Sequence, residues 1–246
     1  MNEAKYLKSP LNIKAVNQEQ KDRFEVITTF CGYGDLETAK IFFMGIEEHK
    51  TLSCLEVEDF VTKLNERKTI NQKEYSSLSS SGIASGLTEK MQRKVYLTLT
   101  PDPLSEEQIF EHGVHCFNYY PLGANKESVY PSHYNNCLGL DFNSKPEFYR
   151  YIEEKTKRKE ILQLFIKEQI LEKGNMLFVF GKGYWNKLEE LFPDIDFIED
   201  KAMNTKSKLN MLKWSKDKQI WLTGHPSHSW FNHDVLMRIA SLRNAL

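Results

Sequence analysis

The stretch KIFFMGIEE, residues 40–48, determines the fold that this sequence predicts. Its apolar run is short, rich in aromatic and β-branched residues, and ends near Gly45, which is the pattern of a buried strand. Such a strand presents Glu47 and Glu48 at its carboxyl end. Because ligands of open α/β sheets bind outside the carboxyl ends of the strands, these acids are candidates for chemistry. Taken alone, the stretch fits better a strand-to-loop junction whose acids merely face water, because acidic loop residues are common.

The composition favours one globular α/β domain. With 246 residues, of which 40% are hydrophobic, the chain is long enough to bury a packed core. Its formal net charge is −1, so any binding of nucleic acid has to depend on a local basic patch. We expect a single domain over residues 1–246, with a polar N-terminal extension over residues 1–25.

The cysteines and the apolar runs bear on cofactors and on location. The four cysteines lie far apart and form no CxxC pair, which argues against a zinc or iron-sulfur site. No apolar run approaches the length of a membrane span, and the first residues are too polar for a secretory signal. We therefore expect a cytoplasmic monomer with no cofactor, no metal or iron-sulfur cluster and no membrane contact.

The remaining apolar patterns alternate between strands and helices, as in α/β proteins. Further strands are predicted over residues 113–120, 175–181, 195–198 and 219–224. Helices are predicted over residues 18–28, 52–64, 87–99, 145–173, 184–191 and 231–244. The polar segment 124–144 is expected to be a long loop. The lysine-rich segment 201–218, which includes Lys206 and Lys208, is expected to be an exposed loop or a phosphate-contacting one.

The stretch CGYGD, residues 31–35, predicts a turn before the first strand, because its glycines permit a positive φ. A bare GxG is a weak signal for phosphate binding. No third glycine opens a helix after a strand, so the chain lacks the dinucleotide-binding fingerprint.

Two more polar residues are expected where strands give way to loops. The Asn118 amide can donate and accept hydrogen bonds at once, as recognition of a nucleobase edge requires, or it can stabilise its own turn. His225 follows the last strand in the sequence HPSHSW, residues 225–230. It is placed either as a hydrogen-bond donor to a ligand or as a helix cap.

The motifs GIEE at residues 45–48 and HPS at residues 225–227 together resemble the uracil-DNA glycosylase superfamily. Members of this family have a water-activating acid or amide after the glycine of the first strand, and a His-Pro-Ser motif after the last strand. Asn118, in the sequence FNYYPL, matches the family residue that recognises the flipped base. Phe60 is similar to the aromatic residue on which that base stacks, although its helical spacing fits core packing as well. The similarity in order covers residues 30–246.

The resemblance implies a three-layer α/β/α sandwich around a mostly parallel four-stranded sheet, and hydrolysis of the N-glycosidic bond of a flipped base. It implies that Glu47 positions water and stabilises the sugar cation, and that His225 stabilises the leaving base. Since the family usually has Asp or Asn at the position of Glu47 and Pro at that of Glu48, a modified or uracil-like base is the expected substrate. The other base-binding candidates are Asn118, Phe60, Ile46 and Glu48. The DNA-binding candidates are Ser227, Ser229, Trp230, Lys206 and Lys208, with Trp230 or Phe231 filling the vacated stack.

Two other functions remain open at this point. A non-catalytic module on the same fold would bind DNA or a protein, and the near-neutral charge favours it. A hydrolase of free nucleosides would need no basic groove.

Overall fold

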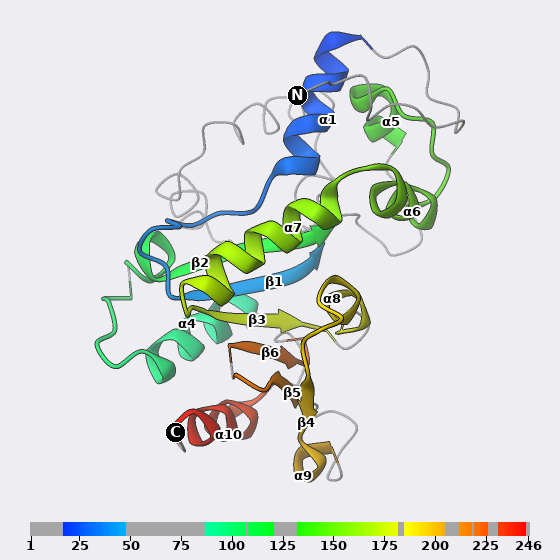
Figure 1. The fold of residues 1–246 in the computed structure, drawn as a ribbon. Coiled ribbons are helices and arrows are strands. Elements are labelled where there is room, and N and C mark those ends of the chain that lie inside the picture. The colour runs from blue at the N-terminus through cyan, green and yellow to red at the C-terminus, as the bar shows by residue number, and fades with distance from the viewer. Residues whose placement is uncertain are drawn as a thin grey trace. The chain divides into compact units, whose positions relative to one another are not determined.

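The structure is a computed structural model, and it describes residues 17–47, 87–106, 108–120, 132–181, 185–204, 212–217, 219–225 and 231–244 (Figure 1). The helix expected over residues 52–64 lies outside these ranges. The described residues form an α/β fold, as predicted.

The secondary structure alternates between strands and helices along much of the chain. The strands are β1 (Ile41–Glu47), β2 (Val114–Tyr120), β3 (Met176–Phe180), β4 (Phe197–Glu199), β5 (Leu212–Ser215) and β6 (Ile220–Thr223). The α-helices are α1 (Gln18–Thr29), α4 (Leu87–Leu99), α5 (Ser132–Leu138), α6 (Lys145–Lys155), α7 (Arg158–Ile166), α8 (Trp185–Leu191), α9 (Lys201–Asn204) and α10 (His233–Asn244). Two π-helical turns, η4 (Ile109–Gly113) and η5 (Lys167–Glu172), precede β2 and β3.

The chain divides into two compact units, each assembled from segments that are distant in the sequence. Unit 1 comprises Met1–Cys31, Glu47–Thr69 and Asn118–Leu164. Unit 2 comprises Gly32–Ile46, Ile70–Phe117 and Phe165–Leu246, and it holds most of the sheet.

The sheet has six strands in the order β2-β1-β3-β6-β5-β4. Strands β1, β3 and β6 are parallel, with Met44 and Leu222 both paired to Val179. Strand β5 runs antiparallel to β6, and β4 runs antiparallel to β5. The sheet is therefore mixed and has two strands more than the four expected. Strand β5 lies inside the lysine-rich segment that was predicted to be a loop, so that prediction was wrong for residues 212–215.

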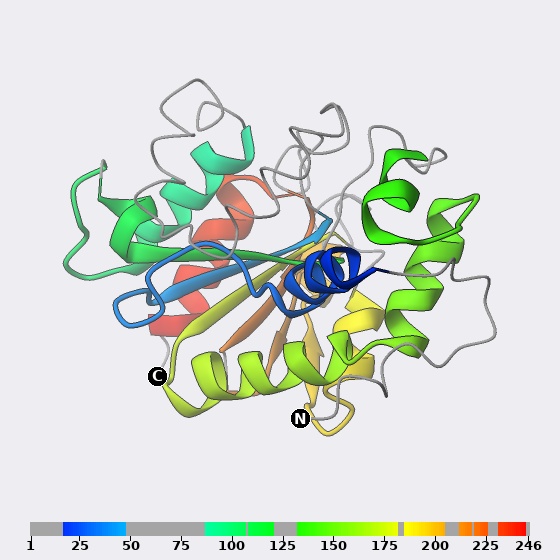
Figure 2. The same ribbon diagram turned by 90° about the horizontal axis from the view of Figure 1, so that it is seen from above.

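Residues 41–44 of β1 are buried on both faces of the sheet, and they alternate between the faces because strand side chains point to opposite faces in turn. Ile41 and Phe43 belong to a core that also contains residues of α4, η4 and α10. On the other face, Phe42 packs against His115, with ring centroids 5.3 Å apart, and against Phe165. Figure 2 shows α4 and α10 on one side of the sheet and η5 on the other. In unit 2, β1 is thus covered on both sides.

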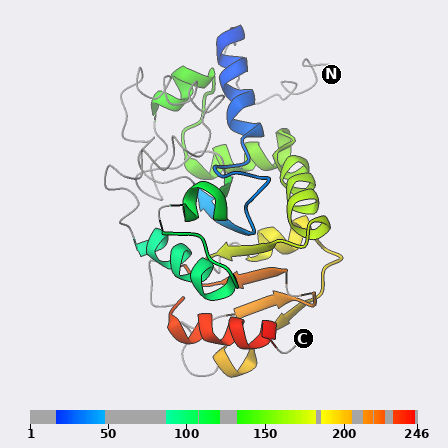
Figure 3. The same cartoon turned by 90° about the vertical axis from the view of Figure 1, so that its left-hand side faces the viewer.

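Helices α4 and α10 lie side by side in unit 2 (Figure 3). The bounds of α4 are those predicted, and α10 starts two residues later than expected, after Asn232. The Asn232 side chain accepts a hydrogen bond from the Val235 amide at 3.2 Å, which caps the helix start. Near the other end of α10, Arg243 donates to the Leu99 carbonyl at 3.0 Å, which satisfies a terminal carbonyl of α4.

The predicted glycine turn before β1 is present, and the space available explains its composition. Gly32 and Gly34 have φ values of 102° and 141°. Between them, Tyr33 exchanges two main-chain hydrogen bonds with Cys116 of β2, each 2.8 Å long. A Cβ atom on Gly34 would lie 2.6 Å from the Cα atom of the buried His115. Glycine is therefore required here both for its backbone conformation and for a close approach to β2.

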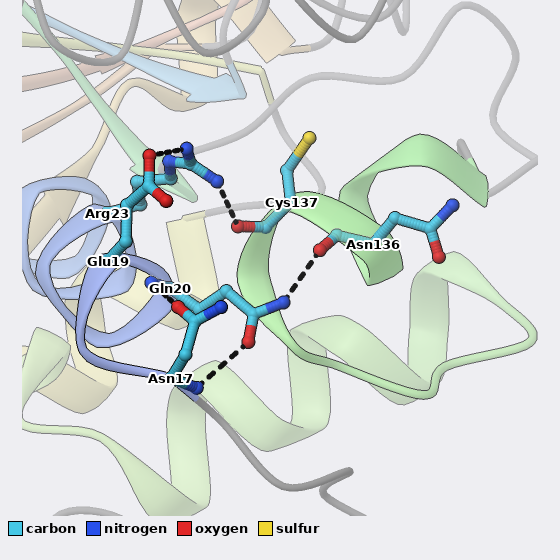
Figure 4. A network of polar contacts seen from close by, with 6 residues as sticks. All are labelled: Asn17, Glu19, Gln20, Arg23, Asn136 and Cys137. Atoms are coloured by element: carbon cyan, nitrogen blue, oxygen red, sulfur yellow. Dashed lines mark hydrogen bonds and ion pairs between the residues drawn. The ribbon is translucent and has the colours of Figure 1, made fainter.

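In unit 1, a group of polar contacts joins α1 to α5 (Figure 4). Asn17 caps α1, and its side chain and that of Gln20 form a reciprocal capping box. Gln20 also donates to the Asn136 carbonyl at 2.9 Å, and Arg23 donates to the Cys137 carbonyl at 3.2 Å. Helix α1 begins where the sequence predicts, and these contacts place α5 against it.

Helix α5 contradicts the prediction that residues 124–144 are a loop throughout. Tyr134, Cys137 and Leu138 are buried, and they have the spacing of one helical face. The Asn135 side chain accepts from the Phe142 amide at 3.0 Å and donates to its carbonyl at 2.7 Å, so the following turn is also ordered. The polar composition of this segment conceals its apolar spacing.

The single helix predicted over residues 145–173 is in fact three consecutive elements, α6, α7 and η5. The break lies at Thr156, whose hydroxyl donates to the Ile152 carbonyl at 2.6 Å and accepts from the Arg158 amide at 3.2 Å. One side chain thus ends α6 and caps α7.

Candidate functional site

Strand β1 ends within one residue of the end that the sequence predicts. The strand continues through Ile46 and ends at Glu47. Its parallel neighbour β3 ends at Phe180, so the two strands open onto the same edge of the sheet. Glu47 therefore ends its strand at the edge where ligands of open α/β sheets bind.

His225 follows β6 at the same edge. It is half-buried and lies two residues after Thr223, the last residue of the strand. The Thr223 carbonyl accepts hydrogen bonds from the Gly181 amide at 3.0 Å and from the Trp185 indole at 3.2 Å. The end of β6 is thereby attached to the end of β3 and to α8, which fixes the backbone just before His225.

The strand register relates β1 to β6. Met44 of β1 and Leu222 of β6 both pair with Val179 of β3, so the two strands run parallel to β3 on either side of it. Glu47 is the last residue of β1, whereas His225 lies two residues beyond the end of β6.

Asn118 lies within β2, two residues before the strand ends at Tyr120. It is half-buried, and its main-chain carbonyl accepts a hydrogen bond from the Arg158 side chain at 2.6 Å. Two residues later, the ring of Tyr120 stacks on Tyr149 with a centroid distance of 3.7 Å, and its hydroxyl donates to Glu153. The end of β2 is thus held by contacts within unit 1.

A buried arginine in this region could not be predicted from the sequence. Arg158 is only 1% exposed and donates to main-chain carbonyls. Burial raises the pKa of the neighbouring Cys31 thiol, and the Arg158 guanidinium partly opposes this increase. The surrounding sequence KRKE has the composition of a solvated helix face, so nothing in it indicates that one cation turns inward.

Several predicted site residues lie outside the described residues: Glu48, Phe60, Lys206, Lys208, Ser227, Ser229 and Trp230. The backbones of Ile46 and Glu47 belong to β1, as stated above.

Phe231 is described, and it is a core residue. It is 1% exposed, and its ring lies 5.9 Å from that of Phe180 and 6.5 Å from that of Phe178. Its proposed part in filling a vacated base stack was therefore wrong, because its side chain is already committed to the core.

The basic segment after β4 is more structured and less uniformly positive than expected. Residues 201–204 form α9, so here too the loop prediction was wrong. Lys213 of β5 forms an ion pair with Glu189 at 2.9 Å, and its ammonium lies 5.6 Å from the centre of the Trp185 ring. This lysine fastens α8 to the sheet, so it adds little to a basic surface for DNA.

Within the described ranges, no cluster of three or more His, Cys, Asp or Glu side chains is arranged to hold a metal ion. None of the helices described there has the length and apolar character needed to cross a membrane. Comparison of the chain with protein-family models, with curated proteins and with solved structures gave no match. The case for a function therefore depends on the residues of this chain.

Proposed function

We propose that this chain is a DNA glycosylase that hydrolyses the N-glycosidic bond of a flipped uracil-like or modified base. The observation that supports this most directly is that an acid, Glu47, ends β1 and a histidine, His225, follows β6, the two strands that run parallel to β3 on either side of it. An acid and an imidazole at one edge of a sheet are the two groups that this reaction needs.

The chemistry places opposite charges on the two parts of the substrate. As the bond between the sugar C1′ atom and the base nitrogen breaks, the sugar becomes cationic and the base becomes anionic. Glu47 stabilises the sugar and orients a water molecule, takes a proton from it, and directs its oxygen to C1′. His225 donates a hydrogen bond to the base as negative charge develops there, which is most effective when the donor is already in place. The base leaves the duplex before this step, because its glycosidic bond is otherwise out of reach.

Asn118 selects the base by hydrogen bonds to its edge. Ile46, Glu48 and Phe60 are the other residues to which we assign contacts with the base. The serines and lysines after β6 and α9, Ser227, Ser229, Lys206 and Lys208, contact the phosphates, and Trp230 fills the vacated stack.

The proposal extends to the architecture and the setting of the protein. We assign the sheet and its two helical layers to the uracil-DNA glycosylase type, with β5 and β4 as an addition to the core β2-β1-β3-β6. The protein acts on DNA as a monomer in the cytoplasm, without a cofactor.

The test is a panel of single- and double-stranded oligonucleotides carrying different modified bases, followed by mass analysis of the released bases. The expected result is one class of free base together with an alkali-labile abasic site. Absence of base release from every oligonucleotide would contradict the proposal.

Two variants test the assigned roles. Glu47→Gln and His225→Gln are each expected to lower the rate of base release at least 100-fold while DNA binding persists, since general acid-base and electrostatic contributions have about this size. Glu168→Gln and His233→Gln, at exposed positions of η5 and α10, are the matched controls and should keep wild-type rates. Full activity of Glu47→Gln would remove Glu47 from the mechanism.

The second candidate is a binding module on the same fold, and the net charge of −1 favours it. In that case the oligonucleotide or a protein partner is bound, but neither free base nor an abasic site forms. Base release by the wild-type protein that depends on Glu47 separates the two functions.

A further inference from the structure

Arg158 makes an unusual set of contacts for a fully buried cation. Its side chain donates to four main-chain carbonyls: those of Thr28 at 3.2 Å, Phe30 at 2.6 Å, Asn118 at 2.6 Å and Tyr119 at 3.1 Å. All of these residues belong to unit 1. The planar guanidinium has five donors in a fixed arrangement, so it can hold several carbonyls at set angles.

The four carbonyls come from the end of a helix and the end of a strand. Thr28 lies in the last turn of α1 and Phe30 caps that helix, where carbonyls have no intrahelical donor. Asn118 and Tyr119 lie near the end of β2, which is the outermost strand on its side of the sheet. A cation at a helix C-terminus is also favoured by the helix dipole. Arg158 thus ties the end of α1 to the end of β2.

The contacts to β2 hold two consecutive carbonyls. The Arg158 Nη2 atom donates to Asn118 and the Nε atom to Tyr119, so two donors of one planar group fix the same short piece of backbone. The backbone that bears the Asn118 side chain is therefore held by a rigid, charged donor.

We propose that Arg158 is the positioning residue for base recognition by Asn118, an inference that rests on the proposed glycosylase function. By holding the carbonyls of Asn118 and Tyr119, it fixes the direction in which the Asn118 amide leaves the strand. Discrimination between base edges depends on that direction. Displacement of the amide raises the activation free energy more for the correct base, which hydrogen-bonds to it, than for an incorrect base.

The experiment compares Arg158→Lys and Arg158→Met with Asn118→Ala, and uses Arg150→Lys at an exposed position of α6 as the matched control. For each protein, kcat and KM are measured on the released base and on a competitor base with a different Watson–Crick edge. Lysine keeps the charge but concentrates its donors at one atom, so it cannot hold both segments. We expect each Arg158 variant to lose about tenfold or more in the ratio of kcat/KM between the two bases, comparable to Asn118→Ala.

A purely structural role for Arg158 gives a different pattern. A smaller folded fraction lowers kcat for both bases equally and leaves the ratio between them unchanged. The double variant Asn118→Ala with Arg158→Lys should discriminate no worse than Asn118→Ala alone, because both changes remove the same interaction. An unchanged ratio in Arg158→Lys, or additive losses in the double variant, would overturn the proposal.

The outcomes also separate this proposal from the proposed function. If the wild-type protein releases a base and Arg158→Lys keeps full selectivity, only the role of Arg158 fails. If the wild-type protein binds the oligonucleotides without releasing a base, the glycosylase function fails. The role of Arg158 is then tested by the ratio of binding affinities for the two bases. If the protein neither binds nor cuts any oligonucleotide, both proposals fail.

A second measurement is needed if Arg158→Met does not fold. In that case Arg158→Lys and hydrogen exchange at the amides of residues 118–120 provide the readout, with faster exchange expected.

Discussion

At the scale of single residues, the two glycines before β1 are required because the backbone there packs closely against β2. Gly32 and Gly34 have left-handed backbone conformations, and both approach β2 so closely that no Cβ atom fits. Gly34 approaches His115, which is buried against Phe42 and whose Nδ1 atom lies 3.1 Å from the Gly34 carbonyl oxygen. The requirement for glycine is therefore steric as well as conformational.

We predict that Gly34→Ala lowers the free energy of unfolding by about 3 kcal/mol or more, because the strain of a positive φ adds to a collision with the His115 backbone. Gly174→Ala is the matched control, since Gly174 has a φ of 70° but its added Cβ would meet its nearest neighbour at 3.8 Å. The control should lose only about 1–2 kcal/mol, the cost of the backbone conformation alone. Urea unfolding of the two variants measures the difference, and equal losses would contradict the steric explanation.

At the scale of secondary structure, Thr156 decides where one helix ends and the next begins. Its hydroxyl bonds the Ile152 carbonyl and receives the Arg158 amide, so α6 and α7 share one cap. The break also determines where Arg158 is placed, because this arginine is the first residue of α7. A continuous helix would set the guanidinium in a different direction from the carbonyls that it now holds.

We predict that Thr156→Val destabilises the protein by about 1 kcal/mol, the usual cost of losing a helix cap. Valine keeps the branched shape and removes only the hydroxyl. Thr29→Val is the control, because the Thr29 hydroxyl also donates to a carbonyl four residues earlier, that of Glu25 at 2.7 Å, at an exposed position in the last turn of α1. The control is expected to change stability by less than about 0.5 kcal/mol in a denaturant titration. Equal effects in both variants would show that the shared cap contributes nothing.

The sequence predicts the elements whose apolar pattern is strong, and it fails where tertiary contacts decide. Strands β1, β3 and β6 and helix α4 were predicted to within a residue or so, because continuous apolar runs or regular helical spacing define them. Helix α5 and strand β5 are short and polar, so their order depends on neighbours such as α1 and β6. The break at Thr156 interrupts a pattern of lysine, glutamate and apolar residues that continues on both sides of it.

For the candidate site, the sequence indicates which polar residues lie at strand ends, but not which side chains hold their backbone in place. Glu47 and His225 follow recognisable apolar runs, so their location at strand ends was predictable. The surroundings of Asn118 were not, because Arg158 lies 40 residues further along the chain within a run of charged residues. Its burial results from carbonyls contributed by two distant segments, which no local pattern reveals.

At the scale of the whole molecule, the stability of unit 2 depends on aromatic packing around β3. All five residues of this strand are buried. Phe178 lies at its centre, with ring centroids 5.7 Å from Phe43 and 6.5 Å from both Trp221 and Phe231. Phe178 thus contacts aromatic rings from two neighbouring strands and from the segment before α10, all on one face of the sheet.

We predict that Phe178→Ala lowers the free energy of unfolding by about 3–5 kcal/mol, as expected for a cavity left by a buried phenylalanine. Phe197→Ala, at a half-buried position of the edge strand β4, is the matched control. It should cost less than half as much, because solvent already reaches that ring. Thermal or urea unfolding measures both variants, and a small loss for Phe178→Ala would mean that the core collapses to fill the space.

The distribution of tryptophan between the two units provides a way to observe them separately. Trp185, Trp214, Trp221 and Trp230 all fall within the segments of unit 2, and none falls within those of unit 1. Fluorescence excited selectively in tryptophan therefore reports on unit 2 alone, whereas circular dichroism in the far ultraviolet reports on the helices of both units. If the two signals change together during denaturation, the units melt as one cooperative body; if they separate, an intermediate with only one unit intact is populated.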